Sequence, residues 1–415
     1  MPSLLIVTAA FAPCQWVGAR RPERMARHLP ARGWEVCVLT VLPQYTPPVD
    51  NALHYVGPAE VLRTHAVLPR MALRSVRDRL HAGRKSAAAP ANPNQRPRPT
   101  SLIARAGRLA GRWLEFPDEW IGWAPFALRA VRGRRFDAVL ATVPVFSAGL
   151  IAQRLAKRCG AKLAIDYRDS WTEVVALDQD AATTRRHQNA EDMLLTQTQL
   201  VVAVTPTIGD RLHARCPVPV AVVPNAIDDT GPPAPWPTEA RLAYVGSLAY
   251  GRDLAPVLQA MGQLRQTQGI AVRLTYAGGD APLALQQAEA HGVADLLDAH
   301  GPVSQARALQ LVDAARAGIV ISAPGYEYAY PGKIFEILGR QRPIVAIGPA
   351  DSEVVRLPQR CEVGFGHAAG DVAGLVQTLA KLAASAAPQL RGAVQFTPQA
   401  TMDQLDGALR TMLAA

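Results

Sequence analysis

Two side chains in the last third of the chain, Lys333 and Glu336, have types and a spacing that suit joint chemistry. Because they are three residues apart, they lie on one face if the segment is helical. An ammonium near a helix N-terminus attracts a phosphate, and a carboxylate one turn further on can accept hydrogen bonds from both hydroxyls of a ribose. The alternative is an exposed Lys–Glu helix pair, which is common and contributes only about 0.3–0.5 kcal/mol.

The residues around this pair predict the element that positions it. The apolar run 317–322 (AGIVIS) is typical of a buried parallel strand, and a second such strand is predicted over 344–348. Between them Pro331 and Gly332 break the chain, and a short helix is predicted over 333–338. Its N-terminus would lie at the carboxyl ends of a parallel sheet, where open α/β sheets bind ligands.

A second candidate for phosphate binding is the loop from Gly246 to Arg252, which follows a predicted strand at 241–245. Glycines before a helix N-terminus present backbone N–H groups to an anion, and Arg252 can add a bidentate phosphate contact. The alternative is an ordinary turn between a strand and a helix. The loop alone is weak evidence for a site.

A third group, Asp166, Arg168 and Asp169, lies at the end of a strand predicted over 163–167. The two aspartates could form a carboxylate pair that binds a divalent ion through a diphosphate. Alternatively, Arg168 pairs with an aspartate and orients the turn. Alternation of acid and base neutralises the group, which favours the second interpretation, and we expect no metal site.

Repeated strand–helix patterns predict an α/β protein with two domains. Residues 4–41 contain a βαβ opening without the GxGxxG fingerprint of dinucleotide-binding proteins. The pattern restarts at 241 after a Pro-rich stretch, and 415 residues are too many for one ordinary core. We therefore expect Rossmann-like domains over 1–224 and 225–395, and a final segment, 396–415, that crosses back to the first domain.

The order of several motifs resembles that of retaining family-4 glycosyltransferases with the GT-B fold. P-G-K-I-F-E before a P-I-V strand is similar to their donor-binding segment, and G-A-R-R-P-E-R near the N-terminus is similar to their first βα unit. T-V-P-V-F-S followed by A-I-D-Y-R-D-S-W-T is similar to their acceptor side. The resemblance covers most of the chain except about 43–114, and it implies two facing Rossmann-like domains with a cleft between them.

The resemblance also implies roles for individual residues. Arg252, Lys333 and Glu336 would be catalytic, with Glu336 on the ribose and the two cations on the diphosphate. The full set of implied donor-binding residues is Gly18, Arg21, Gly246, Ser247, Arg252, Pro302, Val303, Tyr330, Pro331, Gly332, Lys333 and Glu336. The implied acceptor-side residues are Thr142, Pro144, Ser147, Asp166, Arg168 and Asp169.

This chain departs from the family pattern at three places. Many relatives have a glutamate where this chain has Tyr328, with Glu327 one residue away. Ser247 stands where several relatives have an arginine, which leaves Arg252 and Lys333 as the cationic pair. Ala226 replaces a glycine after Asn225, so the connection between domains loses a residue suited to positive φ.

The implied activity is transfer of a sugar from a nucleotide-sugar, such as a UDP-sugar, to an acceptor hydroxyl with retention of anomeric configuration. The family needs no metal or other cofactor and serves polysaccharide or glycoconjugate biosynthesis. One alternative is a nucleotide-sugar epimerase of the same fold, which acts on the donor alone. Another is a non-catalytic scaffold that binds a membrane or a polyanion.

Charge is distributed unevenly. Residues 1–225 carry 30 Lys and Arg against 17 Asp and Glu, whereas residues 226–415 carry 14 against 17. The interval 43–114, interpreted as a partly disordered insertion, contains two candidate basic amphipathic helices, at 68–80 and 101–114. They either bind an anionic membrane near a lipid-linked or saccharide acceptor, or form a solvated insertion. Aromatic platforms for nucleic acid are missing, so we expect no nucleic-acid partner.

The chain also carries signals of location. Its five cysteines form no CxxC pair, which is typical of reduced thiols in a cytosolic protein. The N-terminal LLIVTAAFA lacks a basic segment before it and predicts a strand rather than a secretion signal. No apolar run reaches the roughly 20 residues of a spanning helix. We expect a cytoplasmic protein that is peripheral at the inner face of the membrane if the insertion binds lipid.

Overall fold

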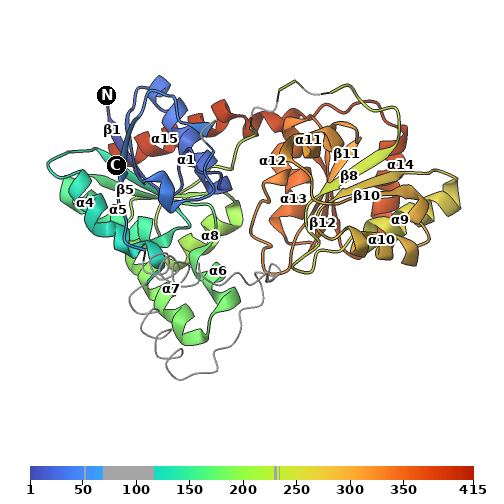
Figure 1. Cartoon of the computed structure of the whole chain (residues 1–415), viewed down its shortest axis with the longest axis horizontal. Helices are drawn as coiled ribbons and strands as arrows, with labels where there is room; N and C mark the ends of the chain where they lie inside the picture. The colour runs from blue at the N-terminus through green and yellow to red at the C-terminus, as the bar shows by residue number, and fades with distance from the viewer. Residues whose placement is uncertain (51–52, 69–115, 229–230, 233) are drawn as a thin grey trace, which may run out of the picture. The chain divides into compact units, whose positions relative to one another are not determined.

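The computed structural model describes residues 1–50, 53–68, 116–228, 231–232 and 234–415 (Figure 1). The two predicted basic helices at 68–80 and 101–114 therefore lie outside the described residues, except for residue 68. The chain divides into two compact units. The N-terminal unit comprises Met1–Val202, His213–Ala221 and Asp406–Ala415, and the C-terminal unit comprises Ala203–Leu212 and Val222–Leu405.

A seven-stranded sheet forms the centre of the N-terminal unit, in the order β3-β2-β1-β4-β5-β6-β7. Leu4, Leu5, Ile6 and Val7 of β1 have no exposed surface, as expected of a strand covered on both faces. The pairs β1–β2, β2–β3, β1–β4 and β4–β5 are parallel. The strands are β1 Ser3–Val7, β2 Glu35–Val41, β3 Glu60–Thr64, β4 Ala138–Val143, β5 Lys162–Tyr167, β6 Leu200–Ala203 and β7 Val220–Val222.

Strand β3 lies inside the interval 43–114 that the sequence suggested was an insertion. It pairs with β2 from Cys37↔Glu60 to Val41↔Thr64, so this part of the interval belongs to the sheet of the domain. Its residues are exposed or half-buried because β3 is an edge strand. An edge strand does not need a continuous apolar run, and the pattern in the sequence was correspondingly weak.

The helices of the N-terminal unit connect its strands, and the end of the last helix of the chain joins them. In that last helix, Asp406 accepts a hydrogen bond from the indole of Trp34 (Nε1 to Oδ1, 2.6 Å), and the carbonyl of Met412 accepts one from Lys162 (3.0 Å). The helices are α1 Arg20–His28, α4 Ala124–Ala130, α5 Phe146–Cys159, α6 Trp171–Asp178, α7 Ala181–Leu195, α8 Pro206–Arg215 and α15 Pro398–Ala414; α8 and α15 are divided between the units.

A six-stranded parallel sheet forms the centre of the C-terminal unit, in the order β10-β9-β8-β11-β12-β13. Alternate residues of its strands face opposite cores: Leu242 and Tyr244 belong to one buried cluster and Ala243 to the other. This alternation follows the two-residue period of a strand. The strands are β8 Arg241–Val245, β9 Arg273–Ala277, β10 Leu297–His300, β11 Ala317–Ile321, β12 Ile344–Gly348 and β13 Gly364–Ala368.

Helices cover both faces of this sheet, as Figure 1 shows for the C-terminal unit. The cluster on one face contains residues of α9 Ala255–Gln268, α10 Ala281–Ala290 and α14 Val372–Ala384. The cluster on the other contains residues of α11 Gln305–Asp313, α12 Lys333–Gly339 and α13 Glu353–Arg360. Each unit is thus an α/β domain with a central, largely parallel sheet, as predicted.

Within the ranges that the structure describes, no helix is both long and apolar enough to cross a bilayer. All five cysteines are free, and four of them are buried.

Candidate functional site

The candidate site of the C-terminal unit is built on the loops that leave the carboxyl edge of its sheet. Parallel strands all end at the same edge, so the loops after β8, β10 and β11 gather there. These loops, with the start of helix α12 that follows the loop after β11, carry the predicted donor-binding residues of this unit. Gly18 and Arg21, the remaining predicted donor-binding residues, belong to the N-terminal unit.

Helix α12 carries Lys333 and Glu336 and is fixed by its apolar face. Gly318 of β11 permits this packing, because a Cβ atom there would lie 2.5 Å from the Ile337 side chain. This apolar face is buried: Ile334, Phe335, Ile337 and Leu338 are 0%, 4%, 3% and 2% exposed.

Lys333 and Glu336 meet on the open side of α12. The Lys333 ammonium lies 2.7 Å from Oε2 of Glu336, and the side chains are 40% and 16% exposed. The pair is therefore formed and reachable by a ligand. An ordinary exposed helix pair has the same geometry, so only a binding measurement separates the two interpretations.

The loop after β8 is held by a carboxylate that the sequence interpretation missed. Oδ2 of Asp280 accepts hydrogen bonds from the Ser247 hydroxyl (2.9 Å) and the Leu248 amide (2.8 Å). Asp280 is the N-cap residue of α10, yet its side chain makes no cap hydrogen bond to that helix. Two of the donors that the sequence suggested for a phosphate are thus bonded to Asp280. The only sequence signal was its position in Gly278-Gly279-Asp280.

The far end of the same loop approaches the loop after β11. Gly251 has a φ of +75°, and a Cβ atom built on it would lie 3.3 Å from the Pro324 ring. Tyr250, also at positive φ (62°), is 59% exposed, and its ring centroid lies 6.5 Å from that of Tyr326. The guanidinium carbon of Arg252 lies 5.8 Å from the centroid of the Tyr250 ring. Arg252 therefore lies beside an exposed aromatic ring at this edge.

Tyr330, predicted to bind the donor, directs its hydroxyl to a buried carboxylate. Oε2 of Glu353 accepts hydrogen bonds from Tyr330 (2.9 Å) and Arg360 (2.9 Å), and Oε1 accepts them from the amide (2.9 Å) and hydroxyl (2.6 Å) of Thr207. Glu353 is 1% exposed. This network fixes the start of the Tyr330–Lys333 segment, and no motif in the sequence pointed to Glu353.

At the position where the resemblance would place a first glutamate, this chain has Tyr328, and neither Tyr328 nor the adjacent Glu327 has a freely exposed side chain. Tyr328 is 1% exposed, and its carbonyl accepts a hydrogen bond from the Thr205 hydroxyl (2.8 Å). Glu327 is half-buried and accepts one from the amide of Gly325 (2.8 Å). Both residues therefore shape the loop after β11.

Glu353→Gln is expected to lower the free energy of unfolding by about 1–1.5 kcal/mol at pH 7, because the amide loses the negative charge and keeps one acceptor oxygen, while its NH2 group faces donors that the second carboxylate oxygen had accepted. Burial raises the pKa of Glu353, but hydrogen bonds from Thr207, Arg360 and Tyr330 outweigh it and hold the pKa below its ordinary value of 4.5. As pH falls below about 4.5, the unfolded chain takes up the proton first, so this contribution is lost.

Urea unfolding of parent and Glu353→Gln between pH 3 and 7 measures this. The difference between the two proteins should shrink as the pH falls below about 4.5. A difference that stays constant with pH would contradict the role given to the ionised carboxylate. The exposed Glu289, changed to glutamine, is the control.

In the N-terminal unit, a buried ion pair joins two of the predicted residues. Nε and Nη2 of Arg21 lie 2.9 and 2.8 Å from the carboxylate of Asp166, and the two side chains are 3% and 0% exposed. An aspartate of this motif does pair with an arginine, but the arginine is not Arg168 as expected. Arg168 donates to the carbonyl of Pro144 (2.8 Å), and the partner of Asp166 is Arg21. An arginine from a distant helix was not predictable from a local motif.

Gly18 provides room for this arrangement. A Cβ atom on Gly18 would lie 2.3 Å from Nη1 of Arg168. Burial raises the pKa of Asp169, and the charge of Arg168 opposes that rise. Gly18, Arg21, Pro144, Asp166 and Arg168 are thus assembled at the carboxyl ends of β1, β4 and β5.

Thr142 and Ser147 lie deeper than acceptor-binding residues need to. Thr142 is 1% exposed and pairs with Asp166 in the register of β4 and β5. Ser147 has no exposed surface, and its hydroxyl and amide bond the carboxylate of Asp118 at 2.5 and 3.0 Å. Burial raises the pKa of Asp118, while the bonds from Ser147 lower it. Both residues are therefore buried beneath the carboxyl edge of the sheet, where they contribute to its packing.

Among the described residues, no group of three or more His, Cys, Asp and Glu side chains could hold a metal ion. The expectation of metal-free chemistry stays a prediction.

Comparison with known proteins identifies the fold. No family model matches the sequence, and no curated protein matches it either. The sucrose-phosphate synthase of Thermosynechococcus elongatus is similar in structure, with a TM-score of 0.60 at 15% identity over 100% of both chains. The lipopolysaccharide outer core galactosyltransferase WaaB has a TM-score of 0.58 at 14% identity over 99% of both chains. The chain has the GT-B fold.

A third similar structure contains a nucleotide. It is HepE of Anabaena in complex with UDP, with a TM-score of 0.57 at 13% identity over 99% of this chain and 100% of that one. At such identities the likeness establishes the fold, and the activity of this chain must be argued from its own residues.

Proposed function

We propose that the protein is a retaining glycosyltransferase that moves a sugar from a nucleotide-sugar, a UDP-sugar in the first instance, to an acceptor hydroxyl. The observation that carries this proposal is the Lys333–Glu336 pair, formed and partly exposed at the start of α12 on the carboxyl edge of the sheet. The similar structures include transferases of sugars and a complex with UDP, which agrees with this chemistry.

In the proposed complex, Glu336 accepts hydrogen bonds from the ribose, and Lys333 and Arg252 neutralise the diphosphate. The bond between the anomeric carbon and the diphosphate oxygen breaks, and that oxygen keeps the electron pair. Stabilising the charge on the leaving group is the largest catalytic contribution expected. The acceptor hydroxyl attacks from the same face, and its proton passes to the departing phosphate, so the configuration is retained.

Ligand binding would rearrange two contacts of the site. The Lys333 ammonium bonds Glu336 in the structure and must share its hydrogen bonds with the diphosphate. The Ser247 hydroxyl and the Leu248 amide already donate hydrogen bonds to Asp280. We therefore propose that Arg252, together with amides of this loop that do not bond Asp280, makes the phosphate contacts. Pro302 and Val303, after β10, are proposed to contact the base.

For the acceptor side we propose the edge formed by Pro144, Arg168 and Asp169. Asp169 is half-buried, and its carboxyl group can form a hydrogen bond with a hydroxyl of the acceptor. The acceptor would be a saccharide or a lipid-linked saccharide in polysaccharide or glycoconjugate biosynthesis. A cytoplasmic protein, peripheral at an anionic membrane and independent of metal, fits this role.

A thermal-shift panel of nucleoside diphosphates and nucleotide-sugars tests the proposal directly. A ligand that binds the folded state raises the melting temperature, by mass action. Stabilisation by at least one nucleoside diphosphate, followed by transfer with retained configuration, is the expected result. A changed sugar without any acceptor would indicate an epimerase. No response to any nucleotide would favour a non-catalytic scaffold.

A further inference from the structure

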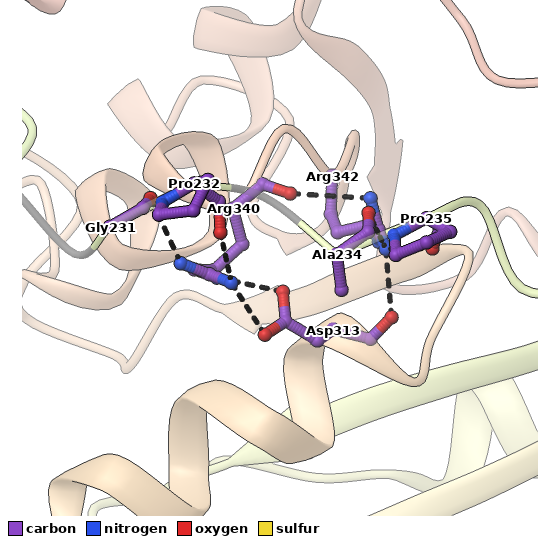
Figure 2. Close-up of polar contacts among 7 residues, drawn as sticks. All are labelled: Gly231, Pro232, Ala234, Pro235, Asp313, Arg340 and Arg342. Atoms are coloured by element: carbon purple, nitrogen blue, oxygen red, sulfur yellow. Dashed lines mark hydrogen bonds and ion pairs between the residues drawn. The ribbon is translucent and has the colours of Figure 1, made fainter.

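Two arginines after α12 hold the Pro-rich segment that was predicted as the domain boundary. Figure 2 shows Arg340 and Arg342 reaching from the end of this helix to the backbone of four residues, Gly231, Pro232, Ala234 and Pro235. The segment is therefore attached to the C-terminal unit. The contacts are Arg340 Nη1 to Gly231 O (3.2 Å), Arg340 Nη2 to Pro232 O (2.9 Å), and Arg342 Nη2 to Ala234 O (3.1 Å) and Pro235 O (2.8 Å).

Asp313, the last residue of α11, completes this group (Figure 2). Its carboxylate accepts hydrogen bonds from Nε and Nη2 of Arg340, at 2.7 and 2.6 Å. Its backbone carbonyl accepts one from Nη2 of Arg342, at 2.8 Å. The Arg340 and Asp313 side chains are 7% and 16% exposed. A bidentate pair of this kind fixes orientation as well as distance. The ends of α11 and α12 are thus locked together.

The same arginines flank a conformationally costly turn. Gln341 has a φ of 53°, a left-handed conformation that usually requires glycine at the end of a helix. The amide of Arg340 donates to the carbonyl of Glu336 (3.3 Å), and the amide of Arg342 donates to that of Ile337 (3.2 Å). Side-chain contacts on both sides of Gln341 hold this turn one helical turn beyond Glu336.

We propose that Arg340 and Asp313 are positioning residues for Lys333 and Glu336, an inference that rests on the proposed function. Helix α12 has only seven residues and is too short to keep its shape alone. Its apolar face holds one side, and the Arg340–Asp313 pair holds its C-terminal end. Without the pair, the helix end can shift, and a shift of about 1 Å at binding groups is enough to weaken a ligand complex strongly.

Arg316 offers a matched control. It holds the same Pro-rich segment through the carbonyls of Pro237 (3.1 Å) and Thr238 (2.6 Å), and its guanidinium carbon lies 6.0 Å from the Trp236 ring centroid. Its other bonds go to carbonyls at the end of α14, such as Ala383 (2.7 Å). Arg316 precedes β11, so its loss should weaken the attachment of the segment without releasing α12.

The experiment compares Arg340→Ala with Arg316→Ala by calorimetric titration of the nucleoside diphosphate that stabilises the parent protein. Both variants should melt at lower temperature than the parent. Below both melting temperatures, Arg340→Ala should bind at least about tenfold more weakly, whereas Arg316→Ala should bind within about twofold of the parent. If Arg340→Ala does not fold, Asp313→Asn, which keeps the size of the side chain, takes its place and should show the same loss.

A double-mutant cycle measures the coupling between Arg340 and Glu336 in ligand binding, which would be zero if Arg340 only stabilised the fold. If Arg340 acts through Glu336, adding Glu336→Gln to Arg340→Ala should cost less affinity than Glu336→Gln costs in the parent. In the cycle with Arg316→Ala, the losses of affinity caused by Arg316→Ala and by Glu336→Gln should add. Parent-like binding by a destabilised Arg340→Ala, or additive losses in its cycle, would overturn the inference while leaving the proposed function intact. A parent protein that binds no nucleotide would overturn both.

Discussion

Glu336→Gln is expected to lower donor affinity or turnover by roughly ten- to 150-fold, because the loss of a charge-assisted contact costs about 1.5–3 kcal/mol. Lys333→Ala should have an effect of the same size. In the unliganded protein each side chain is the partner of the other at 2.7 Å, so neither substitution strands a buried charge. Both variants should therefore keep the stability of the parent within about 0.5 kcal/mol.

A large loss of function with little loss of stability is expected if Lys333 and Glu336 bind the ligand. It is not expected if they form only a surface ion pair on the helix. Titration of the nucleoside diphosphate and steady-state transfer rates measure the first quantity, and urea unfolding measures the second. Glu289→Gln, an exposed change on α10, is the control and should behave as the parent. If both variants bind and turn over donor like the control, Lys333 and Glu336 are an ordinary surface pair.

Asp166→Ala should destabilise the protein by roughly 3–5 kcal/mol, the largest effect on stability that we expect. The substitution leaves the guanidinium of Arg21, 3% exposed, without the carboxylate that receives two of its nitrogens. A buried charge without its counter-ion costs more than the pair contributes. Asp166→Asn keeps an acceptor and should lie between the parent and the alanine variant.

Asp137→Ala is the matched control for this change, since it removes an exposed aspartate beside the opposite end of the same sheet. Asp137 bonds the amide and hydroxyl of Ser3, at 2.7 and 2.8 Å, so its loss should cost no more than about 1–1.5 kcal/mol. Chemical unfolding measures both. A cost for Asp166→Ala no greater than that of the control would mean that the Arg21 guanidinium does not depend on this carboxylate.

The positions of most strands along the chain could be predicted, because a buried parallel strand has a continuous run of apolar residues. The predicted bounds of the strands at 241–245 and 344–348 agree with β8 and β12. Helix α12 begins at Lys333, directly after the predicted break at Gly332. In each case local composition and the backbone preferences of glycine and proline determine the element. Strand β3, a half-buried edge strand, lacked that pattern and was missed.

The partners of the charged side chains were less predictable, because they come from distant parts of the chain. Asp166 meets Arg21 across 145 positions, and Glu353 meets Thr207 across 146. Asp280 bonds the β8 loop across 33 positions instead of capping its own helix. Several acceptors can compete for one arginine or one amide, and only packing decides which of them is close enough.

The sequence by itself determined the α/β architecture, the place of α12 after a buried strand, and the pairing of Lys333 with Glu336 on one helix face. These properties depend on residues within one or two turns of each other. Only the tertiary structure decided that Asp280 occupies the donors of the β8 loop, that Glu353 holds Tyr330, and that Arg340 and Asp313 lock the end of α12. Such contacts depend on how separate elements pack, and no local pattern in the sequence shows which distant side chains come within hydrogen-bond distance.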